Sequence, residues 1–116
     1  MSSSDIDRKI AVIFAADLVG YSKHMEKDEN ATLRGLRECN KIIEPLIKKQ
    51  KGRIFNTGGD SVFAEFPSAV AAVDTAVEFQ KQIKARNDKD TTDVKLEYRI
   101  GVNMGDVVKE GDNLLG

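Results

Sequence analysis

The sequence predicts an α+β domain with a ferredoxin-like βαββαβ core, in which an antiparallel sheet carries helices on one face. Three observations predict this class: a short apolar run near the N-terminus, two long segments with helical periodicity, and a glycine-centred hairpin between them. With a final alternating segment, the order is strand, helix, strand, strand, helix, strand, which is the split βαβ arrangement. The 116 residues fit a single domain.

The first strand is predicted over residues 10–16, IAVIFAA, an unbroken apolar run that is typical of a strand buried on both faces. A helix follows, with Asp28 or Asn30 as its expected cap. Its apolar side chains recur at helical spacing, at Leu33, Leu36, Ile43 and Ile47. An interior proline removes a backbone hydrogen bond, so we expect a kink or break at Pro45.

Two further strands are predicted over residues 53–56 and 61–66, around a Gly58-Gly59 turn. The second helix opens at Pro67-Ser68. Two rows of apolar residues are expected to form one wide buried face on it. They are Val70, Val73 and Val77 in one row, and Ala69, Ala72, Ala76, Phe79 and Ile83 in the other.

Residues 94–104 alternate between apolar and polar side chains, which predicts a half-buried strand with Met104 on its core side. A turn at Gly105-Asp106 and a further strand are expected to follow. Arg99 lies on the polar side, where pairing with Glu97 and a place at a dimer interface both remain open.

Composition excludes several function classes. The chain has 18 basic and 19 acidic residues, so it has no overall positive charge for nucleic acid. Cys39 is the only cysteine, so no intrachain disulfide is possible. The longest apolar run is too short for a membrane segment, and the N-terminus has no signal pattern. We therefore expect a cytoplasmic protein.

The predicted topology places the end of the first strand beside the start of the third, where Asp17 and Asp60 lie. Two adjacent carboxylates repel unless one is protonated or a cation binds. A divalent metal such as Mg²⁺ or Mn²⁺ suits such oxygen ligands. The alternative is ordinary turn and capping chemistry for the two aspartates, and the spacing alone leaves both open.

Residues 18–22, LVGYS, connect Asp17 to the first helix. Gly20 allows the backbone to approach a ligand closely, and N–H groups at a helix start bind phosphate. The aspartates would therefore have a phosphate-binding segment beside them.

Two motifs together resemble the metal-binding motifs of class III nucleotide cyclases: FAADLVGYS at residues 14–22 and GRIFNTGGD at residues 52–60. The segments EFPSAVAAVDTAVEFQ and YRIGVNMGDVV are similar to those that follow in bacterial members. The resemblance runs from Arg8 to Gly116. It implies that residues 1–7 are flexible and that residues 8–116 form a cyclase catalytic domain, incomplete at its C-terminus.

The family converts a nucleoside triphosphate to a cyclic nucleotide and pyrophosphate. The resemblance implies that Asp17 and Asp60 bind two Mg²⁺ or Mn²⁺ ions, with the Leu18 carbonyl as an extra ligand. It also implies homodimers with active sites shared between subunits. The further residues expected at the nucleotide are Val19, Gly20, Tyr21, Ser22, Asn56, Gly59 and Asn113.

Two of these positions depart from the family's pattern. Asn56 stands where a purine-contacting lysine is common, and Asn113 stands where adenylate cyclases often have aspartate. ATP is nevertheless the favoured substrate, because bacterial relatives of this type are usually adenylate cyclases. The family's transition-state asparagine and arginine would follow Gly116, so this fragment alone is expected to be inactive.

Two alternatives remain. A degenerate cyclase-like module that binds nucleotide or mediates dimerisation would also explain Asn56 and Asn113. A diguanylate cyclase is suggested by Gly58-Gly59-Asp60, but that family's signature continues with Glu-Phe, and here Ser61-Val62 follow.

Overall fold

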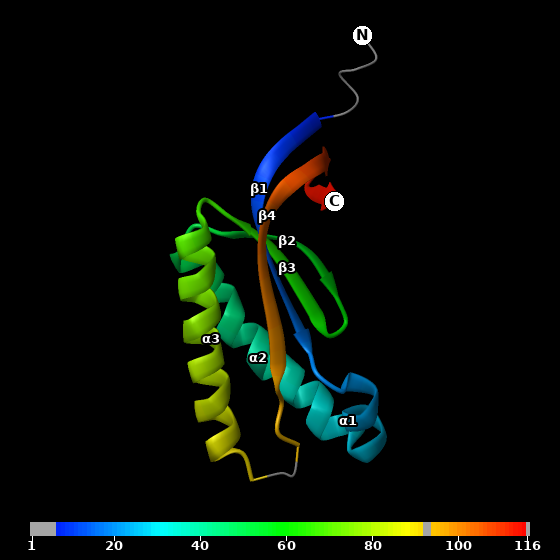
Figure 1. Ribbon diagram of the computed structural model, residues 1–116. Helices are drawn as coiled ribbons and strands as arrows, with labels where there is room; N and C mark the ends of the chain where they lie inside the picture. The colour runs from blue at the N-terminus through cyan, green and yellow to red at the C-terminus, as the bar shows by residue number, and fades with distance from the viewer. Residues whose placement is uncertain (1–6, 92–93, 116) are drawn as a thin grey trace.

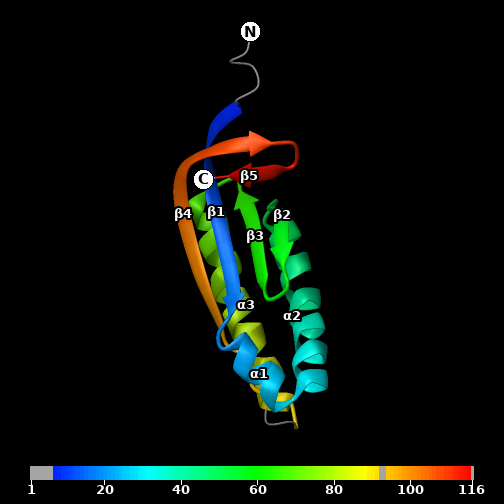
Figure 2. The same cartoon turned by 90° about the vertical axis from the view of Figure 1, so that its right-hand side faces the viewer.

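A curled sheet of five antiparallel strands carries two long helices on one face (Figure 1). The computed structural model describes residues 7–91 and 94–115. The strands are β1 (Asp7–Leu18), β2 (Arg53–Gly58), β3 (Ser61–Phe66), β4 (Tyr98–Glu110) and β5 (Asn113–Leu115). The helices are α1 (Tyr21–Lys27), α2 (Glu29–Lys49) and α3 (Ala69–Lys89). Figure 2 shows α2 and α3 behind the sheet, whose other face is not covered by a helix.

The strand order is β2-β3-β1-β4-β5, so β3 lies between β1 and β2 and is antiparallel to both. This confirms the predicted α+β class and the predicted strand arrangement. The expected flexible segment 1–7 falls outside the described residues except for Asp7, which begins β1.

The core fills the space between the sheet and helices α2 and α3. Every second residue of β1 from Val12 to Leu18 is buried on this side. The Phe14 ring packs against Phe66 with ring centroids 5.6 Å apart. Cys39 is fully buried in the same cluster, and burial raises the pKa of its thiol, so it is a packed side chain rather than a nucleophile.

Both long helices begin at side-chain caps. The Asp28 carboxylate accepts a hydrogen bond from the Ala31 N–H at 3.0 Å, and the Ser68 hydroxyl accepts one from the Ala71 N–H at 3.1 Å. The expected break at Pro45 does not occur, because α2 is continuous from Glu29 to Lys49. Pro45 lies on the exposed side of the helix, where water can satisfy the carbonyl group that loses its partner.

Only one of the two apolar rows of α3 contributes to the core, and its first member, Ala69, is exposed. Ala72 and Phe79 are at most 1% exposed, whereas Val70, Val73 and Val77 are 48–70% exposed. The predicted wide buried face was therefore wrong. A helix lying on a sheet buries a limited stripe, and the valine row lies outside that stripe.

The last long strand differs from its prediction at both ends. Regular pairing begins at Tyr98 rather than at Val94, although Val94 is buried. No turn occurs at Gly105-Asp106, because β4 continues to Glu110 along the extended first half of β1. Met104 was expected in the core but is 61% exposed, since it lies beyond the region where Ile100 and Val102 pack against the core.

A matched pair of glycine substitutions tests the packing around Gly52, between Ile47 of α2 and Phe66 of β3. A Cβ on Gly52 would lie 2.7 Å from the Phe66 ring and 2.8 Å from an Ile47 methyl, whereas a Cβ on Gly101 would meet nothing within 4 Å. We expect Gly52→Ala to lower the free energy of unfolding by about 1–3 kcal/mol. Gly101→Ala should stay within about 0.5 kcal/mol in the same urea titration. Equal effects would contradict this packing.

Candidate active site

Asp17 lies at the end of β1, on the sheet face that no helix covers. In the sheet register it stands opposite Ser61 of β3 on one side and Arg99 of β4 on the other. Cross-strand neighbours share a face, so these three side chains gather at one end of the open face. The Asp17 side chain is 41% exposed and is therefore accessible to a ligand.

Asp60 occupies the tight turn between β2 and β3. Gly59 precedes it with a φ of +53°, a left-handed conformation that favours glycine. The Asp60 carbonyl oxygen accepts a hydrogen bond from the Leu18 N–H at 3.1 Å. The backbone at Asp60 is thus bonded directly to the residue after Asp17, which confirms the predicted juxtaposition of the two segments.

The segment between β1 and α1 turns sharply at Gly20, whose φ is +69°. The Val19 N–H is already used, because it donates to the Glu97 carbonyl oxygen at 2.8 Å. Tyr21 packs against the core, whereas Gly20 and Ser22 are exposed. The first N–H groups of α1 have no intrahelical acceptor, so residues 20–22 are the part of this segment best suited to meet an anion.

Arg99 forms an ion pair with Asp17, with its guanidinium 3.1 Å from the Asp17 carboxylate. The sequence analysis placed Arg99 on the correct face of its strand but did not identify this partner. The register of β1 with β4 was the missing information, because it sets Arg99 directly opposite Asp17. The Arg99 side chain is 73% exposed, so the pair is a surface interaction.

The donor groups at this end of the sheet fit a divalent cation that keeps part of its water shell. Among the described residues, no group of three or more His, Cys, Asp or Glu side chains could hold a metal ion. Two carboxylates and a carbonyl, completed by water and phosphate, are a donor set suited to Mg²⁺ or Mn²⁺. The Arg99 guanidinium on Asp17 shows that a cation can reach that carboxylate.

Asn56 lies farther along the same face because β2 contains a bulge. The register shifts between Ile54 and Asn56, so that Asn56 stands opposite Phe63 rather than following the face of Ile54. A pocket with a cavity volume of about 210 Å³ opens here. Residues from all five strands line it: Ile13, Phe55, Asn56, Phe63, Val107 and Leu114.

Asn113 begins β5, and its side-chain oxygen accepts a hydrogen bond from the Leu114 N–H at 2.9 Å. It is adjacent in sequence to the lining residue Leu114 but does not itself line the pocket. The structure thus divides the predicted residues into two groups on one sheet face. One group lies around Asp17 and Asp60, and the other around Asn56 and β5.

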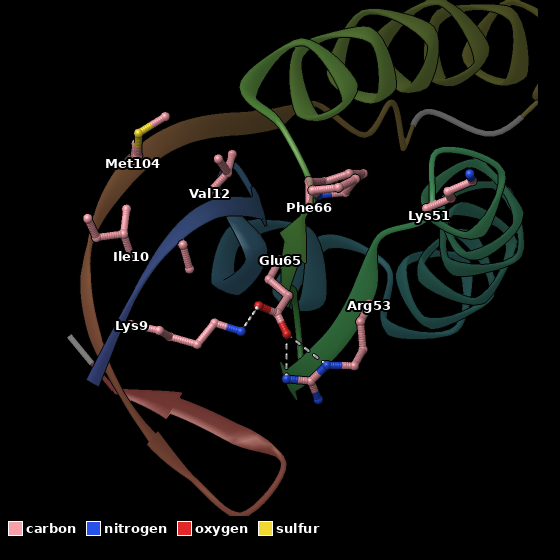
Figure 3. A pocket seen from close by; sticks show the side chains of 10 residues that line it. Lys9, Ile10, Val12, Lys51, Arg53, Glu65, Phe66 and Met104 are labelled. Carbon is pink, nitrogen blue, oxygen red and sulfur yellow. Dashed lines mark hydrogen bonds and ion pairs between the residues drawn. The ribbon is translucent and has the colours of Figure 1, made fainter. Parts of the chain in front are cut away.

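A second charged cluster lies at the opposite end of β3, beside a cavity of about 470 Å³ (Figure 3). The Glu65 carboxylate binds Lys9 at 3.0 Å and Arg53 at 2.8 Å. Burial alone would raise the pKa of Glu65, but the hydrogen bonds from Arg53 and Lys9 outweigh it and hold that pKa below its ordinary value. The sequence analysis did not identify this cluster, because three separate strands supply it.

Comparison with known proteins identifies the family. The family model for the adenylate and guanylate cyclase catalytic domain matches residues 3–113, nearly the whole chain. The chain belongs to this family. It is 41% identical, over its full length, to "Putative adenylate cyclase 3" of Rhizobium meliloti (strain 1021).

Solved structures agree. The adenylate/guanylate cyclase/hydrolase from Silicibacter pomeroyi superposes with a TM-score of 0.84 at 35% identity, over 96% of this chain. The guanylyl cyclase Cya2 superposes with a TM-score of 0.78 at 25% identity, over 96% of this chain.

The chain spans only part of these proteins. It covers 20% of the Rhizobium protein, 65% of the Silicibacter chain and 64% of the Cya2 chain. Within the described residues, no helix is long and apolar enough to cross a membrane.

The pKa of Glu65 gives a pH test of the second cluster. Because folding lowers this pKa, the cluster stabilises the protein above the unfolded value near 4.5, and the contribution is lost as the pH falls through the folded value. We expect Glu65→Gln to destabilise the protein at pH 7, with the difference shrinking between about pH 5 and pH 3. Urea unfolding at each pH measures it. Glu44→Gln, on the exposed side of α2, is the control and should show no such trend.

Proposed function

We propose that this chain forms the metal-binding part of a nucleotide cyclase active site and that the natural enzyme converts ATP to cyclic AMP and pyrophosphate. The supporting observation is that the Asp60 backbone is hydrogen-bonded to Leu18, the residue after Asp17, in a chain of the cyclase family. The face supplies both parts of a shared site: a carboxylate and an arginine that suit the triphosphate of one nucleotide, and a separate apolar pocket that suits the base of another.

In this proposal, Asp17, Asp60 and the Leu18 carbonyl hold two Mg²⁺ or Mn²⁺ ions. When bound, these ions supply charge neutralisation for the triphosphate and lower the pKa of the ribose 3′-hydroxyl. The 3′-oxygen gives up its proton to solvent water and forms a bond to the α-phosphorus. The bond from the α-phosphorus to the bridging oxygen breaks, and pyrophosphate leaves with the electron pair.

The chain's own residues position the substrate for this step. Residues 19–22 wrap the phosphates at the start of α1, with Gly20 and Ser22 nearest to solvent. Gly59 keeps the β2–β3 turn tight enough to hold Asp60 beside Leu18. Once a metal ion occupies the Asp17 carboxylate, the displaced Arg99 guanidinium lies within reach of a phosphate oxygen.

The purine base is assigned to the pocket around Asn56, with Asn113 at its β5 side. The amide of Asn56 can both donate and accept a hydrogen bond, and Phe55 and Phe63 offer apolar surface to the base. The family works as dimers with shared sites. In this proposal the pocket therefore binds the base of a nucleotide whose phosphates lie at the aspartates of a second copy. Adenine is preferred to guanine because the chain is 41% identical over its full length to a protein named as an adenylate cyclase.

The second candidate is a cyclase-like module that binds nucleotide without turnover. Arg99 favours it, since its guanidinium pairs with the Asp17 carboxylate and so competes with a metal ion for it. Asn56 and Asn113 favour it too, because neither supplies the charge that is common at its position in the family. Saturable nucleotide binding without cyclic product in the natural protein would support this candidate over the first.

The cyclase proposal predicts the effect of removing either carboxylate. In the natural full-length protein with Mn²⁺ and ATP, Asp17→Asn and Asp60→Asn should each lower kcat about 100-fold or more, since charge stabilisation in the transition state is lost. Cyclic AMP formation measures this. Asp74→Asn is the matched control, because Asp74 is exposed on α3 and away from the open face. Unchanged turnover in both site variants would exclude the two-metal role.

The Arg99 ion pair predicts an effect on metal affinity. Because the guanidinium occupies the Asp17 carboxylate and repels a second cation, Arg99→Gln should tighten Mn²⁺ binding without nucleotide by about two- to fivefold. Calorimetric titration with Mn²⁺ measures the dissociation constant. Arg37→Gln removes an equal charge from the exposed side of α2 and should have no effect. Weaker Mn²⁺ binding in Arg99→Gln would show that Arg99 does not compete for the site.

A further inference from the structure

The two edges of the sheet come together on the open face, although they stand at opposite ends of the strand order. β2 and β5 are the edge strands, yet they contact each other. Figure 2 shows β4 bending across the top of the sheet to the β4–β5 turn on the side of β2, from which β5 runs back. The pocket around Asn56 exists because of this curl, since β2 supplies one wall and Leu114 of β5 another.

One side chain connects these edges by hydrogen bonds. Arg53 of β2 donates through Nε to the Glu65 carboxylate at 2.9 Å and through Nη1 to the Asp112 carbonyl oxygen at 2.7 Å. Asp112 belongs to the tight turn that joins β4 to β5, directly before Asn113. The planar guanidinium can make both contacts at once because its donors point in different directions.

Glu65 fixes the other side of the same guanidinium. Its side chain is 18% exposed, and it is held by Lys9 at 3.0 Å as well as by Arg53 (Figure 3). A carboxylate anchored from β1 gives Arg53 a defined orientation. Lys9 shares Glu65 with Arg53, but the hydrogen bond to the β4–β5 turn comes from Arg53.

We propose that Arg53 is a positioning residue for nucleotide-base selection, because it joins β2 to the β4–β5 turn and so fixes the distance between Asn56 and Asn113. This inference rests on the proposed cyclase function for its effect on substrate. β5 has three residues and pairs with β4 alone in the sheet. Strand pairing by itself therefore does not fix the distance between β5 and β2. The hydrogen bond from Arg53 to Asp112 fixes it.

The positions of both asparagines depend on the hydrogen bond from Arg53 to Asp112. Asn56 is three residues after Arg53 on β2, and Asn113 is the residue after Asp112. Hydrogen bonds to a base weaken steeply when donor and acceptor move out of line. Loss of the bond from Arg53 to Asp112 should therefore weaken base binding and blur discrimination between ATP and GTP, while the metal-binding end around Asp17 keeps its geometry.

The test compares Arg53→Gln with Lys9→Gln in the natural full-length protein. Each substitution removes one positive charge and one partner of Glu65, but only Arg53→Gln removes the bond to Asp112. Steady-state kinetics with ATP and with GTP give KM, kcat and the ratio of kcat/KM for the two substrates. Amide hydrogen exchange of residues 113–115 reports on β5 without any substrate.

We expect Arg53→Gln to raise the KM for ATP about tenfold, with a smaller change in kcat, and to reduce the ATP:GTP ratio at least about threefold. Residues 113–115 should exchange faster than in Lys9→Gln, whose KM and ratio should stay near those of the natural protein. Arg53→Lys keeps the positive charge but loses the planar guanidinium. Its KM for ATP and its substrate ratio should fall between those of Arg53→Gln and Lys9→Gln.

Two results would overturn the inference, and they can be told apart from failure of the proposed function. If the natural protein makes cyclic nucleotide and Arg53→Gln matches Lys9→Gln in KM and substrate ratio, Arg53 contributes only to stability. If the amide hydrogens of residues 113–115 exchange equally fast in the two variants, Arg53 does not hold β5 in place. A natural protein that neither binds nucleotide nor makes product rejects the cyclase proposal, and base selection by Arg53 falls with it.

Discussion

The pairing of β1 on both of its sides is the constraint on which the rest of the structure depends. β1 pairs with β3 only from Val12 to Asp17, whereas it pairs with β4 along its whole length. From Lys9 to Ala11, β1 therefore pairs with residues 105–107 of β4 alone, as a two-stranded ribbon between the part that pairs with β3 and the part of β4 that pairs with β5. Such ribbons twist more strongly than wide sheets, which accounts for the curl that returns β5 toward β2. The same register sets Asp17 between Ser61 and Arg99 at the other end.

This constraint gives the two sheet faces different properties. Helices α2 and α3 bury one face in the main core, whereas the other face is concave and carries only a small apolar cluster around Ala11, Val107 and Leu114. Charged side chains stand at both ends of the concave face, with Asp17 at one end and Glu65 at the other. An apolar centre with polar groups at its margins is the usual character of a ligand site, and here one strand register produces all of it.

The sequence was sufficient where local patterns decide the structure. Strand order and the meeting of Asp17 with Asp60 followed from periodicity and topology, because turn residues and alternation are local properties. The sequence was insufficient where contacts between residues far apart in the chain decide the structure. The bulge that turns Asn56 onto the open face has no glycine to mark it. The partner of Arg99 depends on the register of strands far apart in the chain, and the exposure of Met104 depends on where the helices end.

In the proposed base site, Asn56 and Asn113 place an unusual demand on this geometry. Adenine presents an amino donor where guanine presents a carbonyl acceptor, and an asparagine amide can satisfy either by rotating half a turn. A charged residue at Asn56 or Asn113 would discriminate by its chemistry alone, but an amide discriminates only if its orientation is fixed. At Asn113 the side-chain oxygen already accepts a hydrogen bond from the Leu114 N–H, which leaves the amino group to donate, and this suits the N1 acceptor of adenine rather than its amino group. Selectivity in such a site must therefore come from the backbone that carries the amides, and the contacts of Arg53 with Glu65 and Asp112 hold that backbone.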